Sequence, residues 1–456
     1  MANQMMQDKA SEMAATQTVP TGYKQTEVGV IPEDWSVLAI SDRHEIATGN
    51  TPPTADTCNY GTDYLFIGPG DLGSGKYVFS SMKMLSSKGF TLARKFPAGS
   101  TLFTCIGSTI GKTGYVVDVV TSNQQINAVF PNELDDSEFT YYALTNIAPK
   151  VRELAGEQAV PLVNKKDFGE MKYCLPANKQ EQTAIANVLS DSDSLIVGLE
   201  QLIAKKQAIK TATMQQLLTG RTRLPQFALR SDGTLKGYKS SELGQIPEDW
   251  AVAAVSEVLT EISMGPFGSD IKVSNFVKSG VPVLNGINVS ASKLVDSFSN
   301  FVTHEKAKEL NKAVASRGDV VVTHRGTIGQ ISYIPDDSLF DRYVISQSQF
   351  RARFNNQVLP VWVVLFFLSP AGSARLLEGK GHTGVPAIAQ ASTTFRKLKF
   401  SLPSLEEQTA IATILSDMDS ELTALQQKLA KARDVKQGMM QQLLTGRIRL
   451  PVEQVE

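Results

Sequence analysis

Two glycine-containing segments carry the residue types of a phosphate-binding loop. Residues 102–116, LFTCIGSTIGKTGYV, place Gly-Lys-Thr after an apolar run that is typical of a strand. A P-loop is Gly-x4-Gly-Lys-[Ser/Thr], in which backbone N–H groups surround the phosphates and the lysine reaches the outer ones. Only three residues separate Gly107 from Gly111, one fewer than a P-loop has. The segment is therefore either an ATP site with a deletion or another structure that needs two glycines and a lysine, and its duplicate, in which Gln330 and Ile331 replace Lys112 and Thr113, favours the second.

The second segment, GPGDLGSGK (68–76), matches both a dinucleotide fingerprint and a P-loop up to its last position. That position is Tyr77, which replaces the Ser or Thr hydroxyl that holds Mg²⁺. The following residues, YVFSS, are typical of a strand, so the helix N-terminus that would face phosphates is missing. We interpret this segment as a glycine turn.

The segment NTPPT (50–54) resembles the [Asp/Asn]-Pro-Pro-aromatic loop of amino-methyltransferases. Thr51 and Thr54 flank the two prolines, so neither the amide acceptor nor the aromatic platform is in place. The sequence also lacks a Gly-x-Ser-x-Gly elbow, a credible Cys–His pair and a two-carboxylate constellation. We therefore predict that this chain is not an enzyme.

Composition and charge restrict the class of protein. The chain has 456 residues, of which 42% are hydrophobic and 20% charged, as is ordinary for a soluble globular protein. The three cysteines and four histidines show no metal-ligand spacing, which predicts no metal site and fits a reduced, cytoplasmic chain. The formal net charge of −1 argues against a non-specific phosphate binder more than against a specific one.

The sequence contains an internal repeat. GYKQTEVGVIPEDWSV (22–37) returns at 237–252, and the segment 181–225 returns at 407–451. Each half therefore has an opening motif, a divergent body and a shared tail, which indicates a tandem duplication. Within the bodies, STIGKTGY (108–115) aligns with GTIGQISY (326–333), which sets Gln330 against Lys112 and Arg325 against Gly107. Both copies keep Thr-Ile-Gly, so we interpret this segment as a rigid turn that presents changeable side chains.

Each repeated tail is predicted to be a long helix. Apolar residues recur at steps of three and four, which predicts a heptad seam with polar interruptions. A helix of about 40 residues is roughly 60 Å long and must bury such a seam, and the obvious partner is its own duplicate. Packing of each helix on its own body is the alternative. The predicted seam residues are Ile185, Leu189, Ile196, Leu199, Ile203 and Leu217 in the first helix and Ile411, Leu415, Met418, Leu422, Leu425, Leu429, Met439 and Leu443 in the second.

These features resemble one known family, the specificity subunits of type I restriction-modification systems. The resemblance rests on the tail LPxLEEQTAIAxILSDMD…KQGMMQQLLTGRIRL (402–450) and its first copy, and on the opening motifs GYKxxExGxIPEDW. The segment GPFGSDIKVSNFVKSGVPVLNGINV (265–289) is similar to the opening of a target recognition domain. The resemblance covers nearly the whole chain after about residue 20.

The resemblance implies an α+β fold of two tandem-duplicated halves, each a mixed α/β recognition domain followed by a long helix, with the two helices paired as an antiparallel coiled coil. We expect a disordered leader (1–20), target recognition domain 1 (21–178), a central helix (179–222), a linker (223–236), target recognition domain 2 (237–404), a C-terminal helix (405–447) and a tail (448–456). It also implies that each domain reads one half of a bipartite double-stranded DNA target, while the coiled coil sets the spacing.

Partners follow from the same resemblance. Two methyltransferase subunits and motor–nuclease subunits are expected to dock on the chain, which itself does no chemistry. S-adenosylmethionine, ATP and Mg would be bound by those partners, and this chain would need no cofactor, metal or membrane. A two-headed protein-interaction scaffold without DNA binding is the alternative that the near-neutral charge favours, and a nucleotide-driven enzyme is motivated only by the glycine loops.

Candidate DNA contacts are polar and basic residues in the turns of the two bodies, because base edges are read by Arg, Lys, Asn, Gln, Ser and Thr. Each of them is equally compatible with an ordinary solvated side chain or turn former. In the first body they are Thr109, Lys112, Thr113, Asn164, Lys165 and Lys166. In the second they are Ser269, Lys272, Arg325, Thr327, Lys380 and His382.

Overall fold

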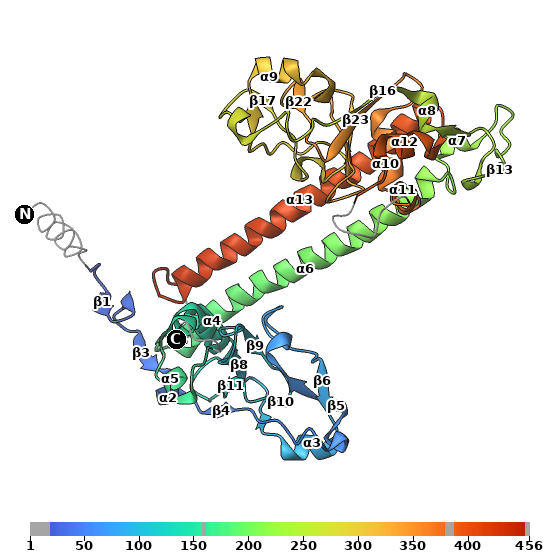
Figure 1. The fold of residues 1–456 in the computed structure, drawn as a ribbon. Coiled ribbons are helices and arrows are strands. Elements are labelled where there is room, and N and C mark those ends of the chain that lie inside the picture. Colours follow the sequence, from blue (N-terminus) through green and yellow to red (C-terminus); the bar gives the residue numbers. More distant parts are fainter. Residues whose placement is uncertain (1–18, 157–160, 379–386, 452–456) are drawn as a thin grey trace, which may run out of the picture. The chain divides into compact units, whose positions relative to one another are not determined.

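The computed structural model describes residues 19–156, 161–378 and 387–451. It divides into two compact units, unit 1 with Met1–Gln201 and Gln427–Glu456, and unit 2 with Leu202–Gln426. Each unit contains one globular body and a part of each of the two long helices (Figure 1). Most of the predicted leader, residues 1–18, lies outside the described residues.

In unit 1, body 1 (residues 21–178) is built on two four-stranded sheets. The first has the strand order β4 (Ile46–Thr48), β11 (Ile126–Val129), β8 (Thr101–Thr104) and β9 (Thr113–Tyr115), all antiparallel. The second has the order β6 (Lys83–Leu85), β5 (Tyr60–Ile67), β10 (Val120–Ser122) and β7 (Lys95–Phe96), in which β5 and β10 are parallel. The helices are α2 (Ile40–Arg43), α3 (Ser87–Leu92), α4 (Ser137–Leu154) and α5 (Lys165–Gly169).

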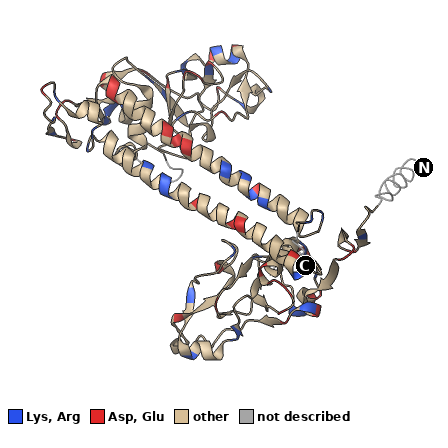
Figure 2. Cartoon of the chain, turned by 180° about the vertical axis from the view of Figure 1, so that it is seen from behind, with Lys and Arg blue, Asp and Glu red and all other residues tan. Residues whose placement is uncertain are grey.

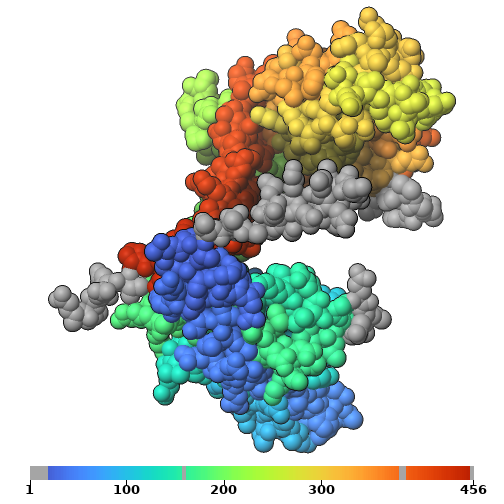
Figure 3. Space-filling model, turned by 90° about the vertical axis from the view of Figure 1, so that its left-hand side faces the viewer, coloured from blue at the N-terminus to red at the C-terminus, as the bar shows by residue number. Residues whose placement is uncertain are grey.

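The opening motif of unit 1 forms a hairpin and one more strand. Strands β1 (Tyr23–Thr26) and β2 (Gly29–Pro32) pair with each other, and β3 (Ser36–Ala39) pairs with β12 (Lys172–Leu175) at the far end of the body. The space-filling view shows these N-terminal residues in blue against the teal and green residues of the same unit (Figure 3). The first and last strands of the body, β3 and β12, thus pair with each other before the long helix begins.

In unit 2, body 2 (residues 237–404) repeats the first of these sheets. Its strand order is β16 (Leu259–Met264), β23 (Gln349–Phe354), β20 (Val320–Thr323) and β21 (Ile331–Tyr333). The pairs β13 (Tyr238–Ser241) with β14 (Gly244–Pro247) and β15 (Ala251–Ala254) with β24 (Lys399–Leu402) repeat β1 with β2 and β3 with β12. The remaining pairs are β17 (Val281–Pro282) with β18 (Phe301–Val302) and β19 (Val314–Ser316) with β22 (Arg342–Val344).

The short helices of unit 2 are α7 (Pro225–Ala228), α8 (Val255–Val258), α9 (His304–Glu309), α10 (Pro360–Leu368), α11 (Pro370–Leu376) and α12 (Ala391–Lys397). Helix α10, VWVVLFFL after its first proline, is apolar on all sides and lies in the core with Trp250 and Phe400. None of the described helices combines the length and apolar character that crossing a bilayer needs. The structure thus confirms the α+β fold and its duplication.

The two repeated tails form long helices, α6 (Lys179–Leu218) and α13 (Leu405–Leu443). Within unit 1, Asp193 and Glu200 of α6 contact Lys436 and Arg433 of α13 at 2.5 and 2.6 Å. Within unit 2, Lys206 contacts Glu421 at 2.7 Å and Lys210 pairs with Asp419. In both units the residue number rises along α6 as it falls along α13, so the two segments in each unit are antiparallel.

All the predicted seam residues of both helices are buried or half-buried. By contrast, Leu195, Leu202 and Ile209, which form an adjoining stripe on α6, are 57%, 38% and 43% exposed. Figure 2 shows acidic residues in the first half of each long helix and basic residues in the second half. The helix face that is buried is therefore the heptad seam, and the flanking positions carry the charges.

Each long helix ends at a left-handed glycine, Gly446 at φ 68° in unit 1 and Gly220 at φ 70° in unit 2. A Cβ at either glycine would lie 2.4 Å from the ring of a proline in an opening motif, Pro32 or Pro247. An arginine then fastens the end of each helix: Arg223 bonds Glu407 at 2.7 Å and Asp249 at 2.8 Å. Arg449 makes the corresponding contacts with Glu181 and Asp34 in unit 1.

Candidate nucleic-acid interface

In each body, four loops gather at one end of the repeated four-stranded sheet. We define loop cluster 1 as residues 49–54, 105–112, 122–125 and 161–164, and loop cluster 2 as residues 265–270, 324–330, 346–349 and 387–390. In cluster 1, Thr51 Oγ1 donates to Gln124 Oε1 at 2.7 Å, and Cys105 N donates to Gln125 O at 2.8 Å. Ile106 and Leu162 form a β-bridge that adds the last loop.

Cluster 2 repeats the backbone contacts of cluster 1. His324 N donates to Ser348 O at 2.9 Å, and Arg325 forms a β-bridge with Ala387. Gly265 N donates to Gln349 O at 2.9 Å. The two clusters therefore share a backbone framework although their side chains differ.

A glycine lets two of the loops touch in each cluster. A Cβ at Gly265 would lie 1.9 Å from the carbonyl oxygen of Ser346, and one at Gly49 would lie 2.3 Å from that of Asn123. Real Cβ atoms do not approach backbone so closely, so only glycine allows the first loop to lie against the third. Gly49, which directly precedes NTPPT, is thus equivalent to Gly265, the first residue of GPFGSD, and the sequence comparison missed this match.

The Thr-Ile-Gly segment is a turn between two strands, as predicted. Gly107 and Gly111 have φ of 88° and 91°, and Gly326 and Gly329 have φ of 82° and 85°. One part of the alignment is wrong, because the bridges place Arg325 opposite Ala387 where Ile106 lies opposite Leu162. Arg325 therefore corresponds to Ile106 rather than to Gly107, and the turn in body 1 is one residue longer.

The structure places the predicted contacts of body 1 in different surroundings. Lys112 is half-buried, and its aliphatic stem lies against Gly73. Thr109 is half-buried in the same turn. Thr113 is buried in β9, where its hydroxyl contacts Thr145 Oγ1 at 2.9 Å, which argues against the predicted DNA contact.

The three predicted residues at the start of α5 divide between two roles. Asn164 caps the helix by accepting from Asp167 N at 2.9 Å. Lys165 and Lys166 are exposed, and Lys166 lies 3.7 Å from Glu170. Asn164 therefore has a structural role, whereas the two lysines remain predicted contacts.

In body 2, the predicted residues Ser269, Lys272, Arg325 and Thr327 are all exposed. Ser269 donates to Asp270 Oδ1 at 3.3 Å, and Thr327 donates to Gln330 Oε1 at 2.7 Å. Lys380 and His382 lie outside the described residues. Three of the exposed residues belong to loop cluster 2, and Lys272 lies two residues after the end of its first loop.

A hollow of about 650 Å³ opens beside loop cluster 2. Phe267, Lys312, His324, Arg325 and Gln347 are among the residues that line it. Burial lowers the pKa of His324, and a backbone hydrogen bond to Gln347 opposes that shift only in part. Neither Phe267, which is 81% exposed, nor Gln347 was predicted. The alignment of Gly49 with Gly265 is the sequence signal that points to Phe267.

Lys76, the lysine of the P-loop-like segment, is buried in unit 1. Its Nζ lies 2.7 Å from Glu138 Oε2 and donates to Ser190 Oγ at 2.7 Å. It also lies 4.8 Å from the ring centre of Tyr142. Burial lowers the pKa of Lys76, although Glu138 opposes the shift. This lysine fastens body 1 to α6 and is not presented to a phosphate.

Comparisons with known proteins agree with this architecture. Residues 32–211 and 247–432 match the family model of the type I restriction modification DNA specificity domain. The chain is 26% identical over 428 residues to the type I restriction enzyme MjaVIII specificity subunit of Methanocaldococcus jannaschii, which covers 92% of this chain and 94% of the relative. It is 25% identical over 443 residues to the putative MjaX specificity subunit of the same organism, covering 94% and 97%.

Two solved structures share the fold. The S subunit of a type I restriction-modification system from M. genitalium superposes with a TM-score of 0.54 at 15% identity, covering 90% of this chain and 96% of that one. A chain from a structure on complex assembly of the type I system has a TM-score of 0.53 at 16% identity, covering 92% and 99%. Since the family model matches both halves, this chain belongs to the type I restriction-modification DNA specificity family.

Proposed function

We propose that this chain is the non-catalytic specificity subunit of a type I restriction-modification complex, and that each body reads one half of a bipartite DNA target through its loop cluster. The observation that supports this proposal is the shared backbone framework of the two clusters with different side chains upon it. A common framework keeps two readers in the same geometry, while different side chains contact different base edges.

Partner docking belongs to the elements that the two halves share. Two equivalent methyltransferase subunits fit a duplicated chain, because a pseudo-twofold scaffold offers the same surface twice. The repeated segments 22–37 with 237–252 and 181–225 with 407–451 are those surfaces. Motor–nuclease subunits join the same complex. Methylation, ATP hydrolysis and cleavage are carried out by these partners in the cytoplasm, with their own S-adenosylmethionine, ATP and Mg.

The spacing of the two half-sites is assigned to the long helices. Two DNA readers on one stiff connection recognise half-sites at a fixed separation, as dimeric DNA-binding proteins do. The gap in the target then depends on the number of heptads in α6 and α13.

Mapping of methylated adenines in cells tests the proposal. The chain is expressed with its methyltransferase partner, and with the partner alone as the matched control. We expect a single bipartite motif of two specified halves and an unspecified gap that appears only when both are present. Methylation without such a motif would contradict the proposal. Binding of protein but not of DNA by the assembled complex would favour a two-headed scaffold instead.

A further inference from the structure

We propose that Arg325 and Phe267 form a base-reading pair in body 2, in which Arg325 reads a guanine and Phe267 contacts the methyl group of a neighbouring thymine. This inference rests on the proposed function and names the bases that loop cluster 2 takes. Thr51 and Ile106 occupy the corresponding positions in body 1.

The correspondence follows from the backbone. Thr51 and Phe267 each stand two residues after the glycine that touches the third loop, Gly49 or Gly265. Ile106 and Arg325 each form the β-bridge that joins the fourth loop, to Leu162 or Ala387. The two positions are therefore held by the same framework in each body, and only the side chains differ.

The side chains in body 2 suit DNA. Arg325 is exposed and lines the hollow beside loop cluster 2, so its guanidinium can reach a ligand there. Arginine binds the O6 and N7 acceptors of guanine through two hydrogen bonds, which is the commonest specific contact in the major groove. Phe267 is 81% exposed and lines the same hollow as Arg325. An apolar ring beside an arginine offers a contact for a thymine methyl group.

The counterparts in body 1 have other chemistry. Ile106 has no donor for guanine, and the hydroxyl of Thr51 is already bonded to Gln124. Body 1 therefore does not read guanine through these positions, and we expect the two half-sites to differ there. Exchange of each residue for its counterpart tests this without disturbing the framework, because each replacement already occurs on the same backbone in the other body.

The experiment uses the complex of the full chain with its methyltransferase partner. Wild type, Arg325→Ile and Phe267→Thr are assayed on duplexes in which each base pair of both half-sites is changed in turn. For wild type we expect one guanine in the second half-site whose replacement weakens binding about 5- to 150-fold. Arg325→Ile should lose that discrimination, and Phe267→Thr should lose discrimination for an adjacent thymine. Half-site 1 and the gap should be unchanged in both variants.

The matched control is Arg342→Ile, because Arg342 is an exposed strand arginine of body 2 that lines a different hollow. The inference is overturned if the second half-site contains no such guanine, or if Arg325→Ile leaves every preference intact. It is also overturned if this variant weakens all duplexes equally and flattens the salt dependence, which indicates a phosphate contact. Failure of the proposed function gives a different result, because the wild-type complex would then show no base preference in either half-site.

Discussion

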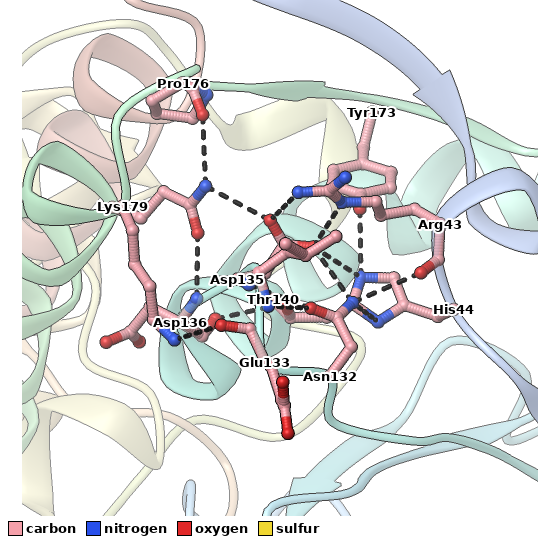
Figure 4. A network of polar contacts seen from close by, with 12 residues as sticks. Arg43, His44, Asn132, Glu133, Asp135, Asp136, Thr140, Tyr173, Pro176 and Lys179 are labelled. Atoms are coloured by element: carbon pink, nitrogen blue, oxygen red, sulfur yellow. Dashed lines mark hydrogen bonds and ion pairs between the residues drawn. The ribbon is translucent and has the colours of Figure 1, made fainter.

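At the residue scale, unit 1 holds a buried polar network where unit 2 is apolar. Asp135 accepts from Arg43 at 2.7 and 2.8 Å, and His44 contacts the Tyr173 hydroxyl at 3.0 Å (Figure 4). The framework around the network repeats: Gln182 accepts from the N–H of Asp136 as Gln408 does from that of Leu359. The positions of Arg43, His44, Asp135 and Tyr173 correspond to Val258, Leu259, Val358 and Phe400, which all lie in or against the apolar core of unit 2.

This correspondence predicts a compensated substitution. Asp135→Val alone leaves the Arg43 guanidinium beside an apolar group, so we expect unit 1 to lose about 3 kcal/mol of stability. The quadruple variant R43V/H44L/D135V/Y173F removes Asp135 together with its charged partner Arg43, while Asn132 and Gln182, which also donate to Asp135, remain. We expect its free energy of unfolding to lie within about 2 kcal/mol of that of wild type. Urea unfolding followed by hydrogen exchange in unit 1 measures both. A quadruple variant less stable than Asp135→Val would show that the two frameworks are not interchangeable.

The same network makes the stability of unit 1 depend on pH. Burial lowers the pKa of His44. The hydrogen bond to the backbone carbonyl of Phe130 and the charge of Asp135 both oppose this shift but do not cancel it. The unfolded chain has a histidine pKa of about 6.5, so below that pH it binds a proton that the native state excludes. The free energy of unfolding should therefore fall as the pH drops from 7.5 towards 5. The pKa of Asp135 is lowered, so the carboxylate contributes fully above about 3.8 and stays constant over this range.

Hydrogen exchange of unit 1 at pH 7.5 and 5, corrected for intrinsic rates, checks this dependence. The quadruple variant, which has no His44, is the control and should show a smaller change. An equal change in both proteins would mean that His44 is not the group responsible.

At the element scale, charge specifies how the long helices pair. Each has acidic residues mainly in its first half and basic residues mainly in its second half. The acidic residues in the first turns, Glu181, Glu406 and Glu407, also suit the helix dipole. Antiparallel pairing sets acidic residues opposite basic ones, as in Asp193 with Lys436 and Lys210 with Asp419. Parallel pairing would oppose like charges. The charge pattern therefore selects the direction, while the seam supplies the buried apolar area.

A charge exchange tests this selection. The Lys210 side chain is 15% exposed and that of Asp419 is 34% exposed, so the pair is only partly screened. Lys210→Asp should destabilise the helix pair of unit 2 by about 1 kcal/mol, and the double variant with Asp419→Lys should recover most of that loss. Protection of amides in 202–218 reports the effect. Absence of recovery in the double variant would show that the lost stability comes from packing of the lysine stem.

At the scale of the whole molecule, the boundary between the units crosses both long helices, at Leu202 in α6 and Gln427 in α13. Each unit is a body completed by a segment of each helix. If the helices set the spacing of the half-sites, the residues on either side of this boundary, near Leu202 and Gln427, determine the length of the connection, and they lie outside both bodies.

Lengthening both helices tests that role. We expect one added heptad after Ala204 and a matching heptad after Gln426 to widen the unspecified gap of the target and to leave both half-sites unchanged, because the loop clusters are untouched. Methylation mapping of the assembled complex measures the gap. A heptad of the same composition added to the tail after residue 451 is the control. An unaltered gap in the lengthened chain would contradict the role of the helices in spacing.

The sequence by itself determined the duplication, the two long helices with their seams, and the interpretation of the glycine segments as turns. These features are local or repeated, so periodicity and self-comparison are sufficient to find them. Only the tertiary structure decided which loops meet, that Lys76 is buried against Glu138, and that Arg325 corresponds to Ile106. Those facts depend on contacts between residues far apart in the chain, and a one-residue difference in a turn is enough to hide them from an alignment. The equivalence of Asp135 in unit 1 and Val358 in unit 2 is also visible only in the tertiary structure. Whether a polar or an apolar residue is stable at that position depends on its burial and on its hydrogen-bond partners.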